Sequence, residues 1–409
     1  MPSGAQREFF TVSTVADALA GFRPGARTRR EVVAVAEAAG RVPAEPVLAT
    51  SALPGFARST VDGYAVRAQD TYGASEGLPS YLEVIGAVRM GVSPTDEVRS
   101  GTAIYIPTGG VLPAGADAVV MIEYTQEAMP GTTEVVRPVA PGEGLVRADE
   151  DVAPGQDLVR SGRPLRAQDL GLLAAAGIIE VPVHARPRVA ILSTGDEVVP
   201  PETPVLSVGQ VRDATSVALA ALVREAGGEP VLRGIVADDR QALERALTDA
   251  LADTDVVVVS AGSSVGARDE TATVVAGLGD IWCHGLALRP GKPTMLADCA
   301  GTPLIGLPGN PRSALVVFRL VGMPIVRRAG GWTETPVEPT VRTRLERNLP
   351  SAAGRLDVVQ VTVRDGEAVP LFGSSSLLSI LITADGYLTV PEEATGLAAG
   401  TEVDVVLYR

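Results

Sequence analysis

Two proline-glycine turns carry the residues best suited to chemistry in this chain. The first lies in LRPGKP at 288–293, and the second lies in GLPGNPRS at 306–313. Proline fixes φ and glycine permits close backbone approach, so each turn can present N–H groups and a polar side chain to an anion. Arg289 and Lys292 flank the first turn, and Ser313 follows the second at an expected helix start. The two turns together predict a basic cup for a small oxyanion or phosphate.

A plainer interpretation exists for either turn alone, namely a tight surface turn with solvated cations. Two such turns in succession, with Asp and Ser-Gly clusters just upstream, favour the binding site.

A glycine- and serine-rich loop, SAGSSVG at 260–266, directly follows the apolar run VVVV. Its amides and hydroxyls could cradle a phosphate or the edge of a pterin, although such loops often serve only as connectors. A serine nucleophile is disfavoured, because the triad needs a positioned base and the chain offers only His184 and His284. The candidate ligand residues in this loop are Gly262, Ser263, Ser264 and Gly266.

Acidic residues recur where strands are expected to end. Carboxylates at several carboxyl ends of one sheet can converge on Mg²⁺ and bridge it to a phosphate. The alternative role is helix capping, which we favour for Asp196 and Asp238. A ligand or metal role is predicted for Glu197, Asp239 and Asp269.

Three further polar residues lie in loops outside this region. Asp62 stands in STVDGYAV, Thr108 in PTGGVLPAGAD, and Asp151 in a Gly/Pro-rich acidic passage. A surface turn explains the first two equally well, and solvation alone explains the third.

Composition limits the classes of function. The chain has 409 residues, which suggests about two to four domains. A formal net charge of −14 disfavours general binding to nucleic acid or anionic membranes, so an anionic ligand needs a local basic site. The two cysteines match no zinc framework, and no segment approaches the ~20 apolar residues of a membrane span. The N-terminus lacks the apolar core of a signal peptide, which predicts a soluble cytoplasmic protein.

The hydrophobic pattern divides the chain into four domains. Segments 1–50 and 147–185 are predicted to form one discontinuous helical domain, through TVADALAGF, REVVAVAEAAGRV and RAQDLGLLAAAGI. Between them, 51–146 contains short β runs separated by turns, as in a small inserted β domain. Alternating Val-rich strands and helices over 186–333 predict a parallel, doubly wound α/β domain with ligands beyond the carboxyl ends of its strands. The remainder, 334–409, is predicted to be a β-barrel or sandwich.

Eight motifs in order resemble the molybdopterin molybdenumtransferase family, the bacterial MoeA proteins, to which the C-terminal part of gephyrin is similar. They are STVDGYAV, IYIPTGGVLPAGADAVVMIE, STGDE, GQVRDAT, SAGSSVGARDET, LRPGKP, GLPGNPRSA and GSSSLLS, and they cover nearly the whole chain.

The resemblance implies a multidomain α/β plus β fold: a discontinuous helical domain, a β insert, an α/β domain of the molybdopterin-binding type and a C-terminal β-barrel. It also implies an elongated homodimer, with the active cleft between the α/β domain of one subunit and the β insert of the other. The implied reaction inserts molybdate into adenylylated molybdopterin with Mg²⁺ present and releases AMP and molybdenum cofactor. A molybdopterin adenylyltransferase is the implied donor of that substrate.

Residue roles follow from the matched motifs. Arg289 and Lys292 would hold molybdate, with Ser313 and the PGNP turn as further donors, because an acidic protein needs local cations for a dianion. Arg355 and Ser374 match positions that the family brings to the same anion, and Glu197, Asp239 and Asp269 match acidic residues around the pterin phosphate and metal. The resemblance implies that Asp62, Thr108 and Asp151 reach in from the partner or the neighbouring domain. The remaining cofactor-binding residues assigned to the two turns are Pro293, Pro308, Gly309, Asn310 and Pro311.

Three departures from the family pattern bear on activity. Ala261 replaces a usual glycine, Thr215 a usual asparagine, and Ala272 a common lysine. A weakened relative that binds molybdopterin as carrier or sensor is therefore an alternative, as is a tungstate-preferring transferase. A scaffold is disfavoured because no added linker or partner-binding tail is evident.

Overall fold

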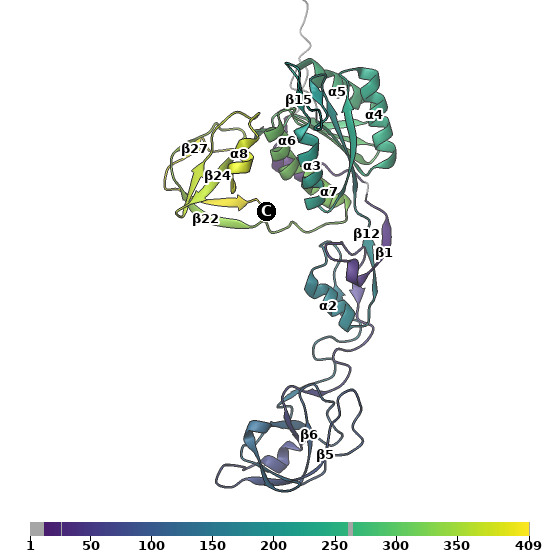
Figure 1. Ribbon diagram of the computed structural model, residues 1–409, viewed down its shortest axis with the longest axis vertical. Coiled ribbons are helices and arrows are strands. Elements are labelled where there is room, and N and C mark those ends of the chain that lie inside the picture. Colours follow the sequence, from purple (N-terminus) through teal and green to yellow (C-terminus); the bar gives the residue numbers. More distant parts are fainter. Residues whose placement is uncertain (1–11, 26, 261–264, 409) are drawn as a thin grey trace, which may run out of the picture.

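The molecule is elongated and built from four units. The structure, a computed structural model, describes residues 12–25, 27–260 and 265–408, with backbone alone for 265–269. An α/β domain and a β-barrel lie side by side at one end, a small linking module follows, and the inserted β domain occupies the far end (Figure 1). Among the described residues, no helix is long and apolar enough to cross a membrane.

The α/β domain is built on a six-stranded sheet. Four strands run parallel as predicted, and the far edge is completed by an antiparallel pair, so the sheet is mixed. In spatial order the strands are β16 (Glu229–Val236), β13 (Arg188–Thr194), β17 (Val256–Ser260), β21 (Thr302–Leu307), β20 (Met295–Cys299) and β18 (Asp280–His284).

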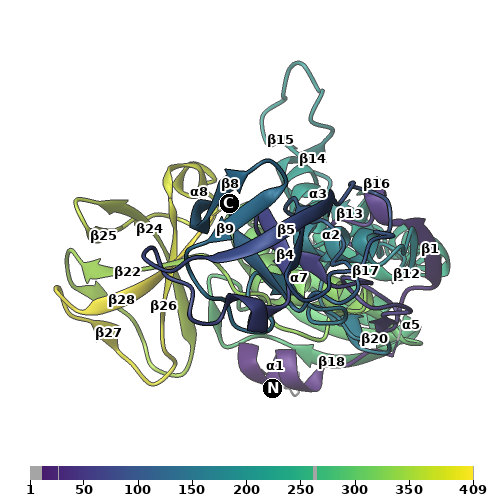
Figure 2. The same ribbon diagram turned by 90° about the horizontal axis from the view of Figure 1, so that it is seen from below.

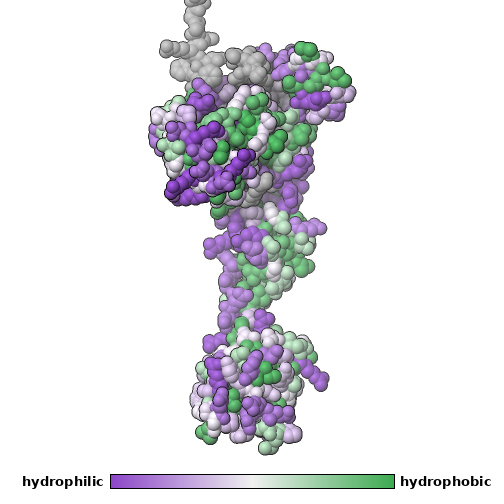
Figure 3. Space-filling model, turned by 60° about the vertical axis from the view of Figure 1, so that its left-hand side comes forward, coloured by the Kyte–Doolittle hydropathy of each residue, from purple (hydrophilic) through white to green (hydrophobic). Residues whose placement is uncertain are grey.

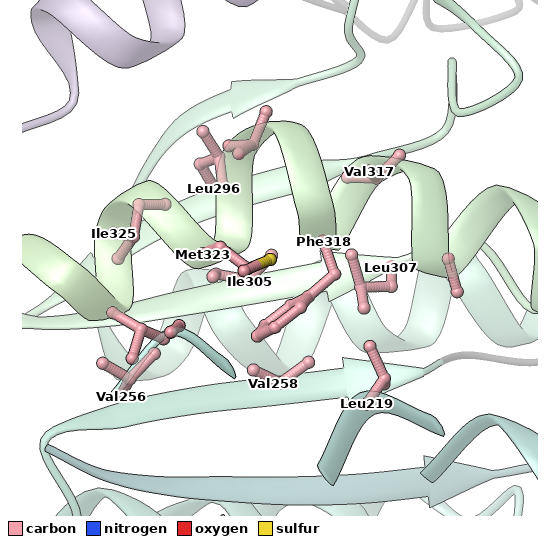
Figure 4. Packing of buried hydrophobic residues seen from close by; sticks show 14 of the residues in the cluster. Leu219, Val256, Val258, Leu296, Ile305, Leu307, Val317, Phe318, Met323 and Ile325 are labelled. Atoms are coloured by element: carbon pink, nitrogen blue, oxygen red, sulfur yellow. The ribbon is translucent and has the colours of Figure 1, made fainter. Parts of the chain in front are cut away.

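Helices cover both faces of this sheet, which confirms the doubly wound architecture. Successive residues of β17 point to opposite faces, so Val256 and Val258 join one apolar core and Val257 and Val259 the other. Figure 4 shows Phe318 of the helical layer pointing toward Val258. The helices are α3 (Ala214–Glu225), α6 (Pro311–Val317) and α7 (Met323–Ala329) on one face, and α4 (Arg240–Asp253) and α5 (Val265–Leu278) on the other.

The first helix, α1 (Val15–Gly21), packs on the α/β domain. Its cap residue Thr14 accepts a hydrogen bond from the Asp17 amide, and Phe22 just beyond it is buried in the α/β core. Arg328 of α7 donates to the Phe22 carbonyl and fixes the helix there. The predicted grouping of this helix with the linking domain therefore differs from the packing observed.

The linking module is not the helical domain expected. The segment REVVA forms strand β1 (Arg30–Ala34), paired antiparallel with β12 (Glu180–His184), and only a short 3-10 turn, Val35–Glu37, follows it. Consecutive β-branched Val32 and Val33 favour a strand, and β12 supplies the hydrogen-bonding edge. The predicted helix α2 (Ala167–Ala175) is present, and a second small ladder joins β2 (Val47–Leu48) to β11 (Asp157–Val159).

The inserted β domain is a six-stranded sheet in the spatial order β7, β4, β6, β5, β9, β8. Gly63 begins β4 where it crosses β7, and an added Cβ would lie 1.9 Å from the Val120 carbonyl oxygen, so only glycine fits. The strands are β4 (Gly63–Val66), β5 (Ser80–Ala87), β6 (Thr102–Ile106), β7 (Ala118–Met121), β8 (Thr125–Met129) and β9 (Thr132–Val135).

The C-terminal unit is a closed five-stranded barrel. Its strands pair in the cycle β24, β25, β22, β28, β26 and back to β24. Of the two predicted alternatives, the unit is therefore a barrel and not a sandwich. A short strand of the α/β domain, β19 (Leu288–Arg289), adds to β24 in parallel and joins the two units. The barrel strands are β22 (Thr340–Leu345), β24 (Leu356–Arg364), β25 (Glu367–Pro370), β26 (Gly386–Val390) and β28 (Glu402–Leu407).

Candidate functional site

A cleft of about 1010 Å³ lies between the α/β domain and the barrel. Both proline-glycine turns line it, so the structure brings together two segments that the sequence separates by the strands β20 and β21. The sequence-predicted residues on its wall are Arg289, Lys292, Pro293, Pro308, Asn310, Ser313, Arg355 and Ser374. Gly309 belongs to the same turn, and Pro311 begins α6 directly after it.

Side-chain contacts fix the second turn against the barrel. Asn310 donates through Nδ2 to the Ser375 hydroxyl at 3.1 Å. Arg312, the second residue of α6, donates to Gln360 Oε1 and to the Gly373 carbonyl, each at 2.9 Å. Burial lowers the pKa of the Arg312 guanidinium. Arg312 is thus a structural link between the two units.

Exposed Arg289 and half-buried Arg355 share one buried carboxylate in the cleft. Arg355 donates from Nε to Asp357 Oδ1 at 3.0 Å, and Arg289 Nη1 lies 3.6 Å from Asp357 Oδ2. The Ser351 hydroxyl donates to Asp357 Oδ2 at 2.8 Å. Lys292 is exposed on the same wall. The arrangement presents cationic groups from two domains to the space between them, which suits a small polyvalent anion.

The loops that carry Glu197 and Asp238 follow the carboxyl ends of the parallel strands, at the same end of the sheet as the second turn. Ser193 of β13, Ser260 of β17 and Leu307 of β21 are in register, so the segments that follow these strands leave the sheet together. Glu197, half-buried, lies just beyond β13. Burial, followed by the charges of Asp196, Glu197 and Glu270, raises the pKa of Asp238.

The capping assignments require correction. Asp239, predicted as a ligand, is the N-cap of α4 and accepts the Ala242 amide at 2.8 Å. Asp238 instead donates its own amide to Asp196, and no helix directly follows Asp196. After STGDE the chain forms a projecting arm between β14 (Val198–Val199) and β15 (Val211–Arg212), visible in Figure 2. Asp213 then caps α3, because its carboxylate reaches the Ser216 amide.

The predicted magnesium set is not assembled in the described residues. No group of three or more His, Cys, Asp or Glu side chains among them is arranged to hold a metal ion. Ala261, Gly262, Ser263 and Ser264 lie outside the described residues, and so does the side chain of Asp269, while Gly266 is described by its backbone alone, within α5.

The two other departures from the family pattern, Ala272 and Thr215, are buried or partly buried and pack within the α/β domain. Ala272 is partly buried and packs against the core under α4, so an alanine satisfies that position. Thr215 is buried in the first turn of α3 and does not cap it.

The third group of predicted residues lies in the inserted domain. Asp62 Oδ1 accepts both the Thr108 amide at 2.7 Å and the Thr108 hydroxyl at 3.0 Å. These bonds, chiefly the one from the amide, lower the pKa of Asp62. Asp151 is exposed where the chain returns toward the linking module, and its amide donates to Leu53. The linking module separates the domain that carries the Asp62–Thr108 pair from the cleft of the same chain (Figure 1).

A second cleft, of about 860 Å³, lies beside α1 and α7. Three of its five arginines are engaged in structural contacts: Arg319 with Glu225, Arg327 with Glu338, and Arg328 with backbone carbonyls of the first helix segment. We therefore place the chemistry in the cleft that holds the two turns.

Asp357, which accepts Arg355 and lies beside Arg289, is not among the residues that the sequence predicted for this cleft. The only signal was its position two residues after Arg355, just inside strand β24. Its pairing with Arg289 depends on β19 joining the barrel, which the sequence did not indicate.

Comparisons with known proteins agree with this organisation. Residues 12–177 match the MoeA N-terminal region (domain I and II), residues 190–328 match a probable molybdopterin binding domain, and residues 342–408 match the MoeA C-terminal region (domain IV).

Curated relatives extend over most of the chain. A molybdopterin molybdenumtransferase from Nostoc sp. is 38% identical over 322 residues, which are 77% of this chain and 73% of the relative. Molybdopterin molybdenumtransferase 2 of Mycobacterium tuberculosis is 36% identical over 386 residues, 91% of this chain and 94% of the relative. A crystal structure of the molybdopterin biosynthesis moeA protein from Pyrococcus horikoshii superposes with a TM-score of 0.86 at 32% identity, covering 97% of this chain and all of that one.

Proposed function

This chain belongs to the MoeA family, and from that membership together with the cationic cleft we infer that it is a molybdopterin molybdenumtransferase of molybdenum cofactor biosynthesis. The reaction we propose inserts molybdate into adenylylated molybdopterin and releases AMP. The observation that carries the assignment is the gathering of Arg289, Lys292 and Arg355 in one cleft of an acidic protein.

The cleft suits molybdate in charge and geometry. Molybdate is a tetrahedral dianion, and two guanidinium groups and an ammonium can each donate to different oxygens. Ser313, Asn310 and Ser374 add neutral donors on the same wall. Holding the anion next to the pterin converts a bimolecular encounter into a positioned one, and that contributes to the rate without a covalent enzyme intermediate.

The pterin substrate would lie along the sheet edge that the acidic loops and the second turn share. Mg²⁺ usually binds one or two carboxylates together with substrate phosphates. Glu197 and Asp238 supply such a partial donor set, whereas Asp239 is committed to capping α4. We therefore propose that Mg²⁺ binds there only together with the adenylate phosphates, whose charge it would offset.

A homodimer would complete the site. The Asp62–Thr108 pair is ordered by its own hydrogen bonds yet lies in a domain remote from the cleft, so we propose that it meets the cleft of a second copy. Apolar residues gather on the surface of the linking module (Figure 3), where Val32, Leu48 and Ile179 are exposed. Such a surface supports association between subunits.

The direct test is release of AMP by the purified protein. Adenylylated molybdopterin, molybdate and Mg²⁺ should yield AMP and molybdenum cofactor, and omission of molybdate should abolish the release. A protein that binds the adenylate but never liberates AMP under these conditions would be a carrier or sensor instead. Replacing molybdate with tungstate in the same assay measures the preference between the two oxyanions.

A further inference from the structure

The two arginines of the cleft are held by a strand contact between domains. Strand β19 of the α/β domain runs parallel to β24 of the barrel, with Arg289 in register with Asp357. The Leu356 amide donates to the Ala287 carbonyl at 2.8 Å, which extends the contact by one residue. Register therefore places a cation of one domain beside a carboxylate of the other.

Burial separates the roles of the three charged groups. The Asp357 side chain is 5% exposed, whereas those of Arg289 and Arg355 are 61% and 36% exposed. The carboxylate faces the protein and accepts Arg355 and Ser351, while both guanidinium groups keep surface toward the cleft. A guanidinium has five N–H donors, so contact with Asp357 leaves donors available for an anion.

We propose that Asp357 is a positioning residue that holds Arg289 and Arg355 as a preformed pair for the oxyanion, an inference that rests on the proposed function. Long arginine side chains lose rotamer freedom when they bind a ligand. A carboxylate that holds both of them beforehand reduces that entropic loss, so the anion binds more tightly to the prepared pair. Asp357 itself does not touch the anion.

The proposal makes a prediction of definite sign. Removing a negative charge from the cleft should by Coulomb's law strengthen binding of a dianion. Removing the anchor of two arginines should weaken it. We expect the loss of positioning to dominate, so Asp357→Asn should bind molybdate more weakly although the cleft becomes more positive.

The experiment is calorimetric titration of the full-length protein with sodium molybdate, without pterin. We expect Asp357→Asn to raise the Kd about tenfold, the loss typical of a charge-assisted hydrogen bond. In the complete reaction the KM for molybdate should rise, while the KM for adenylylated molybdopterin should stay near the wild-type value. Asp404→Asn, on the exposed face of β28, removes the same charge outside the cleft and serves as the matched control.

A milder variant covers the case in which Asp357→Asn does not fold. Ser351→Ala removes one neutral donor to the carboxylate, and we expect a smaller rise of the Kd in the same direction. Unchanged or tighter molybdate binding in a folded variant would overturn the positioning role while leaving the transferase assignment intact. A wild-type protein that neither binds molybdate nor releases AMP would overturn both.

Discussion

The cleft between the α/β domain and the barrel differs from the Asp62–Thr108 pair in how completely one chain builds it. The cleft draws residues from two domains and is fixed by interdomain contacts, among them Arg312 with Gln360 and Arg289 with Asp357. The Asp62–Thr108 pair is held by its own hydrogen bonds, but both residues are exposed, in the domain at the far end of the molecule.

This difference indicates that local hydrogen bonds can fix a pair of side chains in a domain that does not by itself form the whole binding site. The inserted domain has its own sheet and its own apolar cores, so it positions Asp62 without help from the rest of the chain. None of the residues that line the cleft between the α/β domain and the barrel belongs to the inserted domain. We propose that a second subunit brings the two regions together, because in a two-fold symmetric dimer residue i of one copy contacts residue j of the other and residue j contacts residue i.

The largest effect is expected from the cleft itself. Lys292→Ala removes an exposed cation from the oxyanion wall, and we expect molybdenum insertion to fall by about a hundredfold, the cost typical of losing one preorganised donor. The thermal midpoint should stay near the wild-type value, because Lys292 is exposed. The assay measures AMP release at saturating adenylylated molybdopterin. Wild-type rates in this variant would remove the cleft from the mechanism.

Complementation between two inactive variants tests whether the regions meet across subunits. Asp62→Ala should also be strongly impaired. Co-expression with Lys292→Ala should restore about a quarter of the wild-type activity, since about half of the dimers are mixed and each of these has one intact site. Co-purification through two different affinity tags isolates the mixed dimer. A mixture with no more activity than its components would place both residues in the site of a single chain and refute the shared cleft.

A packing change in the inserted domain should lower the stability of that domain without affecting the cleft. Gly63→Ala forces a methyl group against the Val120 carbonyl, and we expect the inserted domain to lose about 1–3 kcal/mol of unfolding free energy. Molybdate binding at the cleft should be unchanged, because the linking module separates the two units. Calorimetric unfolding with molybdate titration checks both parts. Exposed Gly77 of the same domain has open space around it and, like Gly63, no positive φ, so Gly77→Ala is the matched control for the loss of a glycine without a clash.

The smallest effect concerns the protonation of Asp62. Thr108→Val removes the hydroxyl donor and leaves the amide donor, so the pKa of Asp62 should rise while staying below its ordinary value. A depressed pKa stabilises the folded state above the unfolded pKa, and this stabilisation is lost as the pH falls through the folded pKa. The variant should therefore show a slightly weaker acid dependence of stability. Nuclear magnetic resonance titration of Asp62 measures the pKa directly, and an unchanged value would assign the shift to the amide alone.

Several features followed from the sequence because they are local. Runs of Val and Ile bounded by polar loops predicted the α/β strands, since buried parallel strands need apolar residues on both faces. Proline and glycine marked the two turns around Arg289 and Asn310, because backbone restriction is a property of those residue types. The ordered motifs indicated the family in the same way.

The errors arose where a partner strand or the exact register decided the outcome. REVVA has an apolar pattern compatible with a helix, and only pairing with β12 made it a strand. Asp238 and Asp239 are adjacent, and Asp239 is the capping residue because α4 begins at Arg240, directly after it.

By itself, the sequence determined which residues could bind an oxyanion and which segments would form strands, turns and the doubly wound core. Only the tertiary structure decided that β19 joins the barrel, that Asp357 gathers two arginines, and that Asp62 stands far from the cleft of its own chain. The physical reason is that propensity and hydrophobic periodicity are encoded over a few neighbouring residues, whereas these contacts depend on how separately folded units pack against one another.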